Sequence, residues 1–121
     1  MKTNHIVAVM TLIAAVGAAS LAQAHAKMES SEPTADSALQ VAPKAIRLHF
    51  NEVIEPAFSK IALFNAQQVA IALPKVAVDK GDPKTMSATV PALTSGSYSV
   101  RWSTMTHDGH KVKGQYSFTV K

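Results

Sequence analysis

The 121-residue chain contains no cysteine. Disulfides are therefore excluded, and so are sites that need a thiolate: Cys-type zinc sites, iron–sulfur clusters, cysteine nucleophiles and blue-copper centres with a cysteine ligand. A lipid anchor on a cysteine is excluded for the same reason. A secreted domain of about 100 residues can still fold without disulfides when its apolar core is adequate.

The chain also lacks blocks of like charge. Its 12 Lys and Arg and 8 Asp and Glu residues are scattered singly, which gives a net charge of +4. Nucleic-acid binding favours clustered basic residues interleaved with aromatic ones, and only seven aromatic residues are present (one Trp, two Tyr, four Phe). We therefore expect no nucleic-acid partner, and we interpret the mild basicity as favouring solubility.

One apolar run is present, and it lies at the N-terminus. Residues 6–21 are almost continuously apolar, Lys2 precedes them, and residues 22–24 (Ala-Gln-Ala) form a small-x-small cleavage site. A run of about 16 residues is shorter than the roughly 20 that span a bilayer, so a signal peptide is favoured over a membrane anchor. We predict a cleaved signal peptide over residues 1–24, secretion of the protein, and a single mature domain over residues 25–121 that is at most peripheral to the membrane.

The predicted mature chain alternates apolar and polar residues almost throughout. The clearest stretches are residues 46–50, 98–102 and 116–120, with shorter candidates at 27–30, 60–65, 69–73 and 86–90. Period two is typical of strands with one face on a core. Pro, Gly and Asp turn signals separate the stretches. The pattern predicts an all-β domain of seven or so antiparallel strands, a Greek-key sandwich or barrel.

Cleavage after residue 24 would make His25 the first residue of the mature protein. An N-terminal histidine can bind one metal ion through its α-amine and its Nδ1 together. Nitrogen donors in a flat arrangement suit Cu(II). Any residue can follow a signal peptide, however, so a histidine at this position can also be there by chance.

A second candidate is the sequence Asp108-Gly109-His110, in the predicted connection between two neighbouring strands. In extended chain, residues i and i+2 point the same way, about 6.6 Å apart, so the carboxylate and the imidazole can converge on one ion. The alternative is a plain Asp-Gly turn with an exposed histidine. Together with His25, this pair would give Cu(II) three nitrogens and one oxygen. These are the α-amine and Nδ1 of His25, an imidazole nitrogen of His110 and a carboxylate oxygen of Asp108.

Other possible ligands carry less weight. His107 lies out of phase with His110, and His49 alternates with core residues on the polar face of a strand. Glu52 follows that strand and is either a solvated charge or a carboxylate that orients a ligand nitrogen. The mature methionines are scattered and give no Cu(I) cluster, so we expect them to fill gaps in the core or loops: Met28, Met86 and Met105.

Several of these motifs together resemble the CopC/PcoC family of copper-resistance proteins. The start at residues 25–33 is similar to the family's opening, a histidine followed a few residues later by Ser-x-Pro, and residues 46–52 are similar to its apolar-x-Leu-x-Phe-x-Glu strand. Further similar segments cover most of the remaining chain: residues 81–86, 93–102, 108–110 and 114–120.

The resemblance implies a cupredoxin-like (Ig-like) Greek-key sandwich that works in the periplasm in copper resistance and homeostasis, without enzymatic activity. It implies a Cu(II) site at His25, Asp108 and His110 with Glu52 nearby, and an inner-membrane copper permease of the CopD type as partner. Some members carry a methionine-rich Cu(I) loop, but the corresponding residues 65–80 contain no methionine. We therefore expect a monomeric member that binds Cu(II) only.

Two other functions fit parts of the same pattern. A terminal histidine with a second histidine also resembles the copper brace of oxidative polysaccharide-cleaving enzymes, which use an extended aromatic substrate face. The single Trp and both Tyr residues fall at predicted core positions here, which disfavours that enzyme. A metal-free interaction module of the immunoglobulin type is the other alternative.

Overall fold

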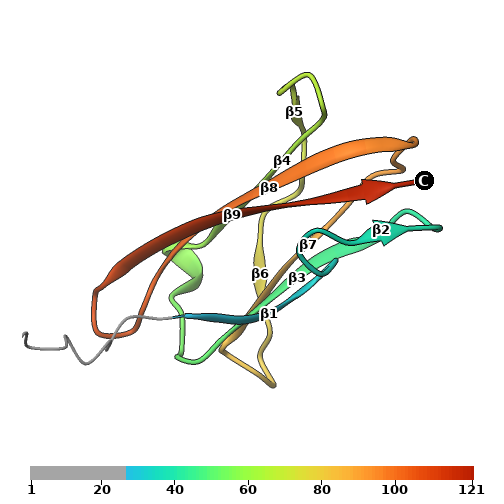
Figure 1. Ribbon diagram of the computed structural model, residues 1–121. Coiled ribbons are helices and arrows are strands. Elements are labelled where there is room, and N and C mark those ends of the chain that lie inside the picture. Colours follow the sequence, from blue (N-terminus) through green and yellow to red (C-terminus); the bar gives the residue numbers. More distant parts are fainter. Residues whose placement is uncertain (1–26) are drawn as a thin grey trace, which may run out of the picture.

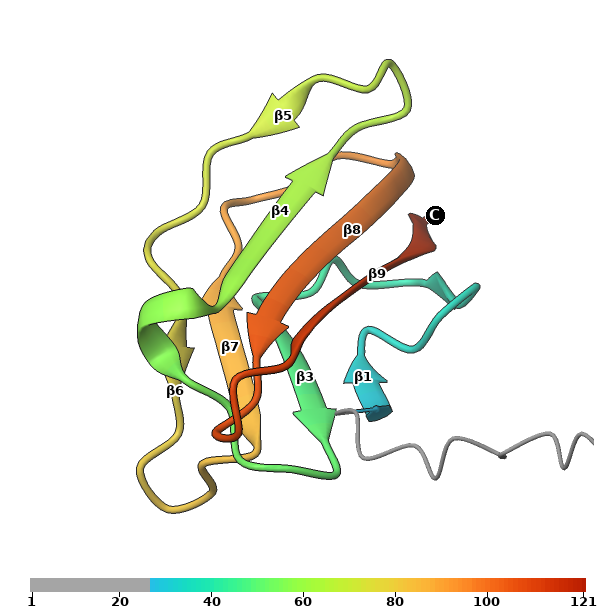
Figure 2. The same cartoon turned by 90° about the vertical axis from the view of Figure 1, so that its left-hand side faces the viewer.

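The computed structural model describes residues 27–121, so the predicted signal peptide and His25 lie outside the described residues. Within this range two β-sheets pack against each other, joined by loops and one short 3-10 helix, η1 (Pro56–Phe58) (Figures 1 and 2). The four-stranded sheet has the order β1 (Met28–Glu32), β3 (Ala45–Phe50), β7 (Thr85–Thr89) and β6 (Ala77–Val78). The five-stranded sheet has the order β2 (Ala38–Leu39), β9 (Lys111–Val120), β8 (Gly96–Met105), β4 (Lys60–Phe64) and β5 (Ala70–Ile71).

The core lies between the inward faces of the two sheets. Strand β3 illustrates this arrangement, because Ile46, Leu48 and Phe50 are fully buried and the residues between them are not. Aromatic residues from both sheets meet in this layer, where the rings of Phe50 and Trp102 pack edge to face with centroids 5.0 Å apart. The predicted all-β sandwich is confirmed, and the alternation predicted its inward face correctly.

The prediction missed two strands and one pairing direction. Strands β2 and β6 have two residues each, which is too short for an alternating pattern to be visible in the sequence. Strand β2 pairs with β9 in parallel, whereas all other strand pairs are antiparallel. Among residues 27–121, no helix has the length and apolar character needed to cross a bilayer.

Strands β8 and β9 form the longest feature of the fold, an antiparallel hairpin that runs from the pair Gly96–Val120 to the pair Met105–Lys111. Within it Gly114 lies opposite Trp102. A Cβ atom on residue 114 would stand 2.5 Å from Cζ2 of Trp102, so the indole ring fills the place of the missing side chain. The predicted neighbourhood of residues 98–102 and 116–120 is confirmed by this hairpin.

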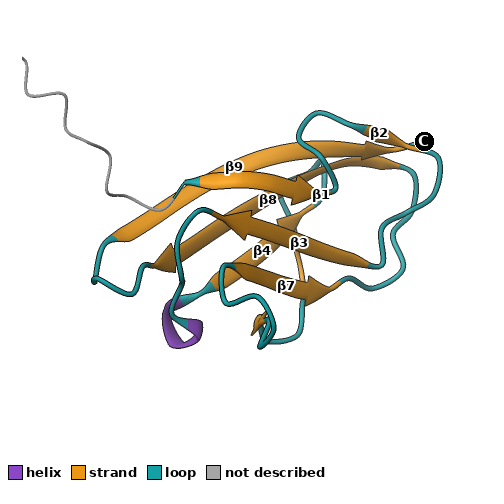
Figure 3. Ribbon diagram, turned by 90° about the horizontal axis from the view of Figure 1, so that it is seen from below, coloured by secondary structure: helices purple, strands orange, loops and turns teal. Residues whose placement is uncertain are grey.

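The loops gather at the two ends of the sandwich (Figure 3). At one end, on the left of Figure 1, strands β1 and β9 begin and strands β3 and β8 end. This end therefore carries the start of the described chain, the segment that follows β3, and the loop between β8 and β9. The segment after β3 contacts both the start of the described chain and that loop.

Candidate metal centre

The loop from Thr106 to His110 is a tight turn at the tip of the β8–β9 hairpin. The amide of Thr106 donates to the carbonyl of His110 at 2.9 Å, and the amide of Gly109 donates to the carbonyl of Thr106 at 2.9 Å. Gly109 has φ of +92°, a backbone conformation that favours glycine. The loop is thus a turn, whereas the sequence interpretation rests on extended chain, and Gly109 allows the turn to close.

This turn brings Asp108 and His110 into direct contact. Oδ2 of Asp108 lies 3.0 Å from Nδ1 of His110, and each side chain is about half exposed. The hydroxyl of Thr106, which is 1% exposed, donates to Oδ1 of Asp108 and accepts from the amide of His110 at 3.1 Å. One buried hydroxyl therefore fixes both the carboxylate and the backbone of the histidine.

The same hydroxyl stabilises the charged form of the carboxylate. The pKa of Asp108 is lowered, chiefly by the hydrogen bond from Thr106 and further by His110. A donor that bonds to the charged form of a carboxyl group stabilises that form. Asp108 is therefore held as an anion, the form in which it can bind a metal ion.

The spacing of the pair fits a tetragonal ion. Two ligand atoms at right angles, each bonded at about 2.0–2.1 Å, lie about 2.9 Å apart. The Asp108 oxygen and the His110 nitrogen are 3.0 Å apart. The two atoms are therefore close enough to serve as neighbouring ligands of one metal ion.

The described chain begins at the same end of the sandwich. The amide of Lys27 donates to Oδ1 of Asn51 at 2.7 Å, and the carbonyl of Lys27 accepts from the amide of Asn51 at 3.0 Å. Two residues further on, the carbonyl of Val53 accepts from the amide of His107 at 3.1 Å. The segment after β3 therefore contacts both residue 27 and the loop that carries Asp108 and His110.

Two glutamates lie on that segment. Glu52 is half-buried between Asn51 and Val53, so it lies on the segment that touches both the start of the chain and the loop. Glu55 was not predicted as a site residue, yet its Oε1 lies 2.8 Å from Nδ1 of His107. Only a Glu-Pro turn signal is visible in the sequence at this position, because nothing local links two residues that are 52 positions apart.

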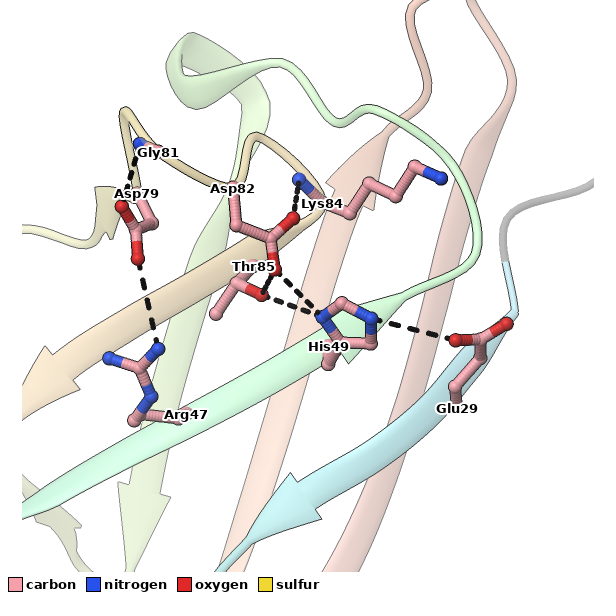
Figure 4. Close-up of polar contacts among 8 residues, drawn as sticks. All are labelled: Glu29, Arg47, His49, Asp79, Gly81, Asp82, Lys84 and Thr85. Carbon is pink, nitrogen blue, oxygen red and sulfur yellow. Dashed lines mark hydrogen bonds and ion pairs between the residues drawn. The ribbon is translucent and has the colours of Figure 1, made fainter.

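His49 belongs to a separate cluster on the outer side of the four-stranded sheet (Figure 4). Its Nδ1 lies 2.7 Å from Oγ1 of Thr85 and 3.2 Å from Oδ2 of Asp82, and its Nε2 lies 3.5 Å from Oε2 of Glu29. The Thr85 hydroxyl donates to Asp82 at 2.8 Å, and this bond is the first cause of the lowered pKa of Asp82. His49 thus links β1, β3 and the loop before β7.

This arrangement favours a structural role for His49. Both of its ring nitrogens face side-chain partners, and within residues 27–121 no group of three His, Asp or Glu side chains is placed to hold a metal ion. Through Glu29, His49 adds a side-chain contact between β1 and β3, which already pair through their backbones. It therefore helps to fix where the start of the chain lies.

The three methionines of the described chain, the tryptophan and the two tyrosines lie where the sequence predicts them. Met86 is fully buried in the core, Met28 packs against the core, and Met105 is half-buried on β8. Trp102 and both tyrosines are buried. The extended face of Trp and Tyr side chains that would favour a polysaccharide-cleaving enzyme is therefore not formed by residues 27–121.

Comparisons with known proteins agree with this fold. The CopC domain family matches residues 28–121. The chain is 40% identical to copper resistance protein C of Pseudomonas syringae pv. tomato over 112 residues, which covers 84% of each chain. It is 35% identical to copper resistance protein C of Escherichia coli over 122 residues, which covers 94% of this chain and 95% of that protein.

Solved structures give the same result. The crystal structure of CopC from Methylosinus trichosporium OB3b matches with a TM-score of 0.76 and 29% identity, over 80% of this chain and 94% of that one. That of selenomethionine PcoC from Escherichia coli matches with a TM-score of 0.72 and 35% identity, over 78% of this chain and 99% of that one. A family match over the whole described sandwich, together with these relatives, shows that the chain belongs to the CopC family, a family of copper-resistance proteins rather than enzymes.

Proposed function

We propose that the mature protein is a periplasmic Cu(II)-binding protein whose site is formed by its own N-terminus and the Asp108–His110 turn. The observation that carries the proposal is that Lys27 and the turn lie at the same end of the sandwich, both in contact with the segment after β3. His25 would be two residues before Lys27. Two residues of extended chain span about 7 Å, so a terminal histidine there would lie at the end of the sandwich that carries the turn.

The proposed ligands are the α-amine and Nδ1 of His25, a carboxylate oxygen of Asp108 and an imidazole nitrogen of His110. Three nitrogens and one oxygen suit a tetragonal Cu(II) ion. Glu52 would act on the ligand nitrogens from outside the coordination sphere, because carboxylates near a metal site commonly accept their hydrogen bonds. The metal is the cargo of this protein, and the sandwich supplies a rigid support for its ligands.

Copper binding of this kind serves buffering or delivery. Half-exposed ligands at one tip of a domain can be approached by an acceptor, which a buried site would prevent. The proposed acceptor is an inner-membrane copper permease of the CopD type. Because the amine and imidazole nitrogens bind metal only without their protons, Cu(II) affinity should fall as the pH falls.

The decisive experiment changes the N-terminus without touching the fold. Mature protein beginning at His25 is compared with a variant that carries one extra alanine before His25, by Cu(II) titration and electron paramagnetic resonance. The extra residue moves the terminal amine away from His25, so the amine and Nδ1 can no longer close one chelate ring; Cu(II) affinity should fall by orders of magnitude and the nitrogen hyperfine pattern should change.

Two further variants complete the test. Asp108→Asn should weaken Cu(II) binding, because an amide oxygen carries no charge. His107→Ala is the matched control, since it removes a neighbouring histidine that is not among the proposed ligands, and it should leave the nitrogen pattern unchanged. Equal affinity of the extended and mature proteins would reject the amine as a ligand.

A further inference from the structure

The outer face of the five-stranded sheet has charge of one sign only. On strands β4, β8 and β9 the residues that point away from the core include four cations: Lys60, Arg101, Lys111 and Lys113. None of the outward positions on these three strands is acidic, because all eight Asp and Glu residues of the chain lie on β1 or in loops. We refer to the outward surface of β4, β8 and β9, with these four cations, as the basic face.

Strand register places the cations in a compact group. Lys60 on β4 and Lys113 on β9 both pair with Ser103 of the central strand β8, so the small serine lies between two lysines about 10 Å apart. Arg101 lies two residues from Ser103 on the same strand, and Lys111 pairs with Met105 at the end of the hairpin. The cations are thus gathered by the fold, although the sequence shows no basic block.

The lysines of the basic face are not neutralised within the described chain. Among residues 27–121 no ion pair with an acidic side chain involves Lys60, Lys111 or Lys113. Arg101 is held in place instead, with its guanidinium 4.3 Å from the ring centroid of Phe64 and donating to Gln68. Like charges gathered without counter-charges repel one another, which an anionic partner would relieve.

The basic face is also hollowed. Two adjoining hollows, of about 550 and 640 Å³, share Lys60, Ser103 and Lys113 in their walls. Phe58 and Met105 line the first hollow, and Phe58 is 55% exposed although it is a large apolar residue. An occupant that fits this surface is therefore acidic, narrow enough to enter a hollow, and partly apolar.

We propose that the basic face docks an extended acidic segment of a partner protein, with carboxylates at the lysines and an apolar side chain at Phe58. A second copy of this chain would bring like charges opposite each other, so it does not fit as the occupant. A flat bilayer surface would not fill the hollows. An extended acidic segment matches the basic face in both charge and shape.

The basic face adjoins the proposed copper site. Lys111 directly follows His110, and its pair with Met105 is the last rung of the hairpin before the turn. A partner docked here would be next to Asp108 and His110, where it could receive the metal. That delivery role rests on the proposed function, whereas the docking itself does not need copper.

The test uses the mature protein and a short fluorescein-labelled polyglutamate peptide, followed by fluorescence anisotropy. Charge reversal of Lys60 and Lys113 (K60E/K113E) should weaken binding about tenfold or more, since two attractive contacts become repulsive. The matched control K44E/K75E makes the same change in net charge at two exposed lysines outside the basic face, and should change the affinity about twofold or less. Melting curves establish that both variants are folded.

Amide chemical-shift mapping shows where the peptide binds. Perturbations confined to β4, β8, β9 and η1 would support the proposal, whereas equal effects of both double variants or shifts spread over the whole surface would overturn it. Vesicles of phosphatidylglycerol and phosphatidylethanolamine form a second arm. Binding to them through the same lysines, tighter than to the peptide, would overturn the protein-segment proposal in favour of a membrane surface.

A further peptide-binding measurement, which does not depend on copper, separates the docking proposal from the proposed copper site. The variant with an extra alanine before His25 should bind the peptide like the mature protein, because the basic face is unchanged. If that variant binds copper normally, the proposed function fails while docking stands. If K60E/K113E binds the peptide normally, docking fails while the copper site stands.

Discussion

Replacing Thr106 by valine tests whether one buried hydroxyl prepares the turn of the proposed copper site. Valine has nearly the shape of threonine, so the core around this 1% exposed residue stays filled while two hydrogen bonds are removed. The lost partners are the carboxylate of Asp108 and the amide of His110. Both residues are exposed to water, so solvent can replace the bonds and the cost is at the low end for lost hydrogen bonds, about 1 kcal/mol.

For a domain of this size, a loss of about 1 kcal/mol lowers the melting temperature by roughly 4–8 °C. The pKa of Asp108 should rise toward its ordinary value, because the Thr106 bond is the largest cause of its depression. Cu(II) affinity should fall about tenfold, which is typical when a group that orients a ligand is removed. Calorimetry, side-chain carboxyl NMR and copper titration measure the three effects.

Thr104→Val is the matched control. Thr104 is 2% exposed, lies two residues earlier on β8, and its hydroxyl is 2.8 Å from that of Ser59, away from the turn. This variant should lose at least as much stability, because the hydroxyl of Ser59 is buried, but it should keep its Cu(II) affinity and the pKa of Asp108. If both valine variants bind copper like the unaltered protein, the view that Thr106 prepares the turn is wrong.

Three further predictions concern the sandwich itself. Gly114→Ala should cost about 1–3 kcal/mol and alter the fluorescence of Trp102, because the added Cβ would meet the indole ring; an unchanged melting curve and spectrum would contradict this close packing. Leu63→Ala should cost about 2–5 kcal/mol in urea unfolding, because the residue is fully buried, and a smaller loss would mean that the core closes around the gap. The pKa of Asp82 is lowered in the folded state, chiefly by Thr85, so its carboxylate stabilises the fold above its unfolded pKa and this contribution disappears as the pH falls through the folded pKa. Asp82→Asn should therefore flatten the loss of stability in acid, and an unchanged slope would refute that role.

The sequence alone identified the faces of the strands. Alternation along β3, β8 and β9 marks which side chains point inward, because successive residues of a strand point to opposite faces whatever strand lies beside it. It also predicted the hairpin and the loop that carries Asp108 and His110, since these features are local in the chain. The resemblance of its motifs predicted the CopC family, and the comparisons confirm that membership.

Only the tertiary structure determines which side chains lie next to one another. Periodicity specifies a face but not a partner, so nothing local could pair His107 with Glu55 or His49 with Asp82, which are more than 30 residues apart. Periodicity likewise could not show that Lys60 and Lys113 lie on either side of Ser103, where they form a basic face from charges that are scattered in the sequence. The local pattern of the chain thus predicts which residues face the core and which face solvent, whereas strand order and register determine which of the exposed residues act together.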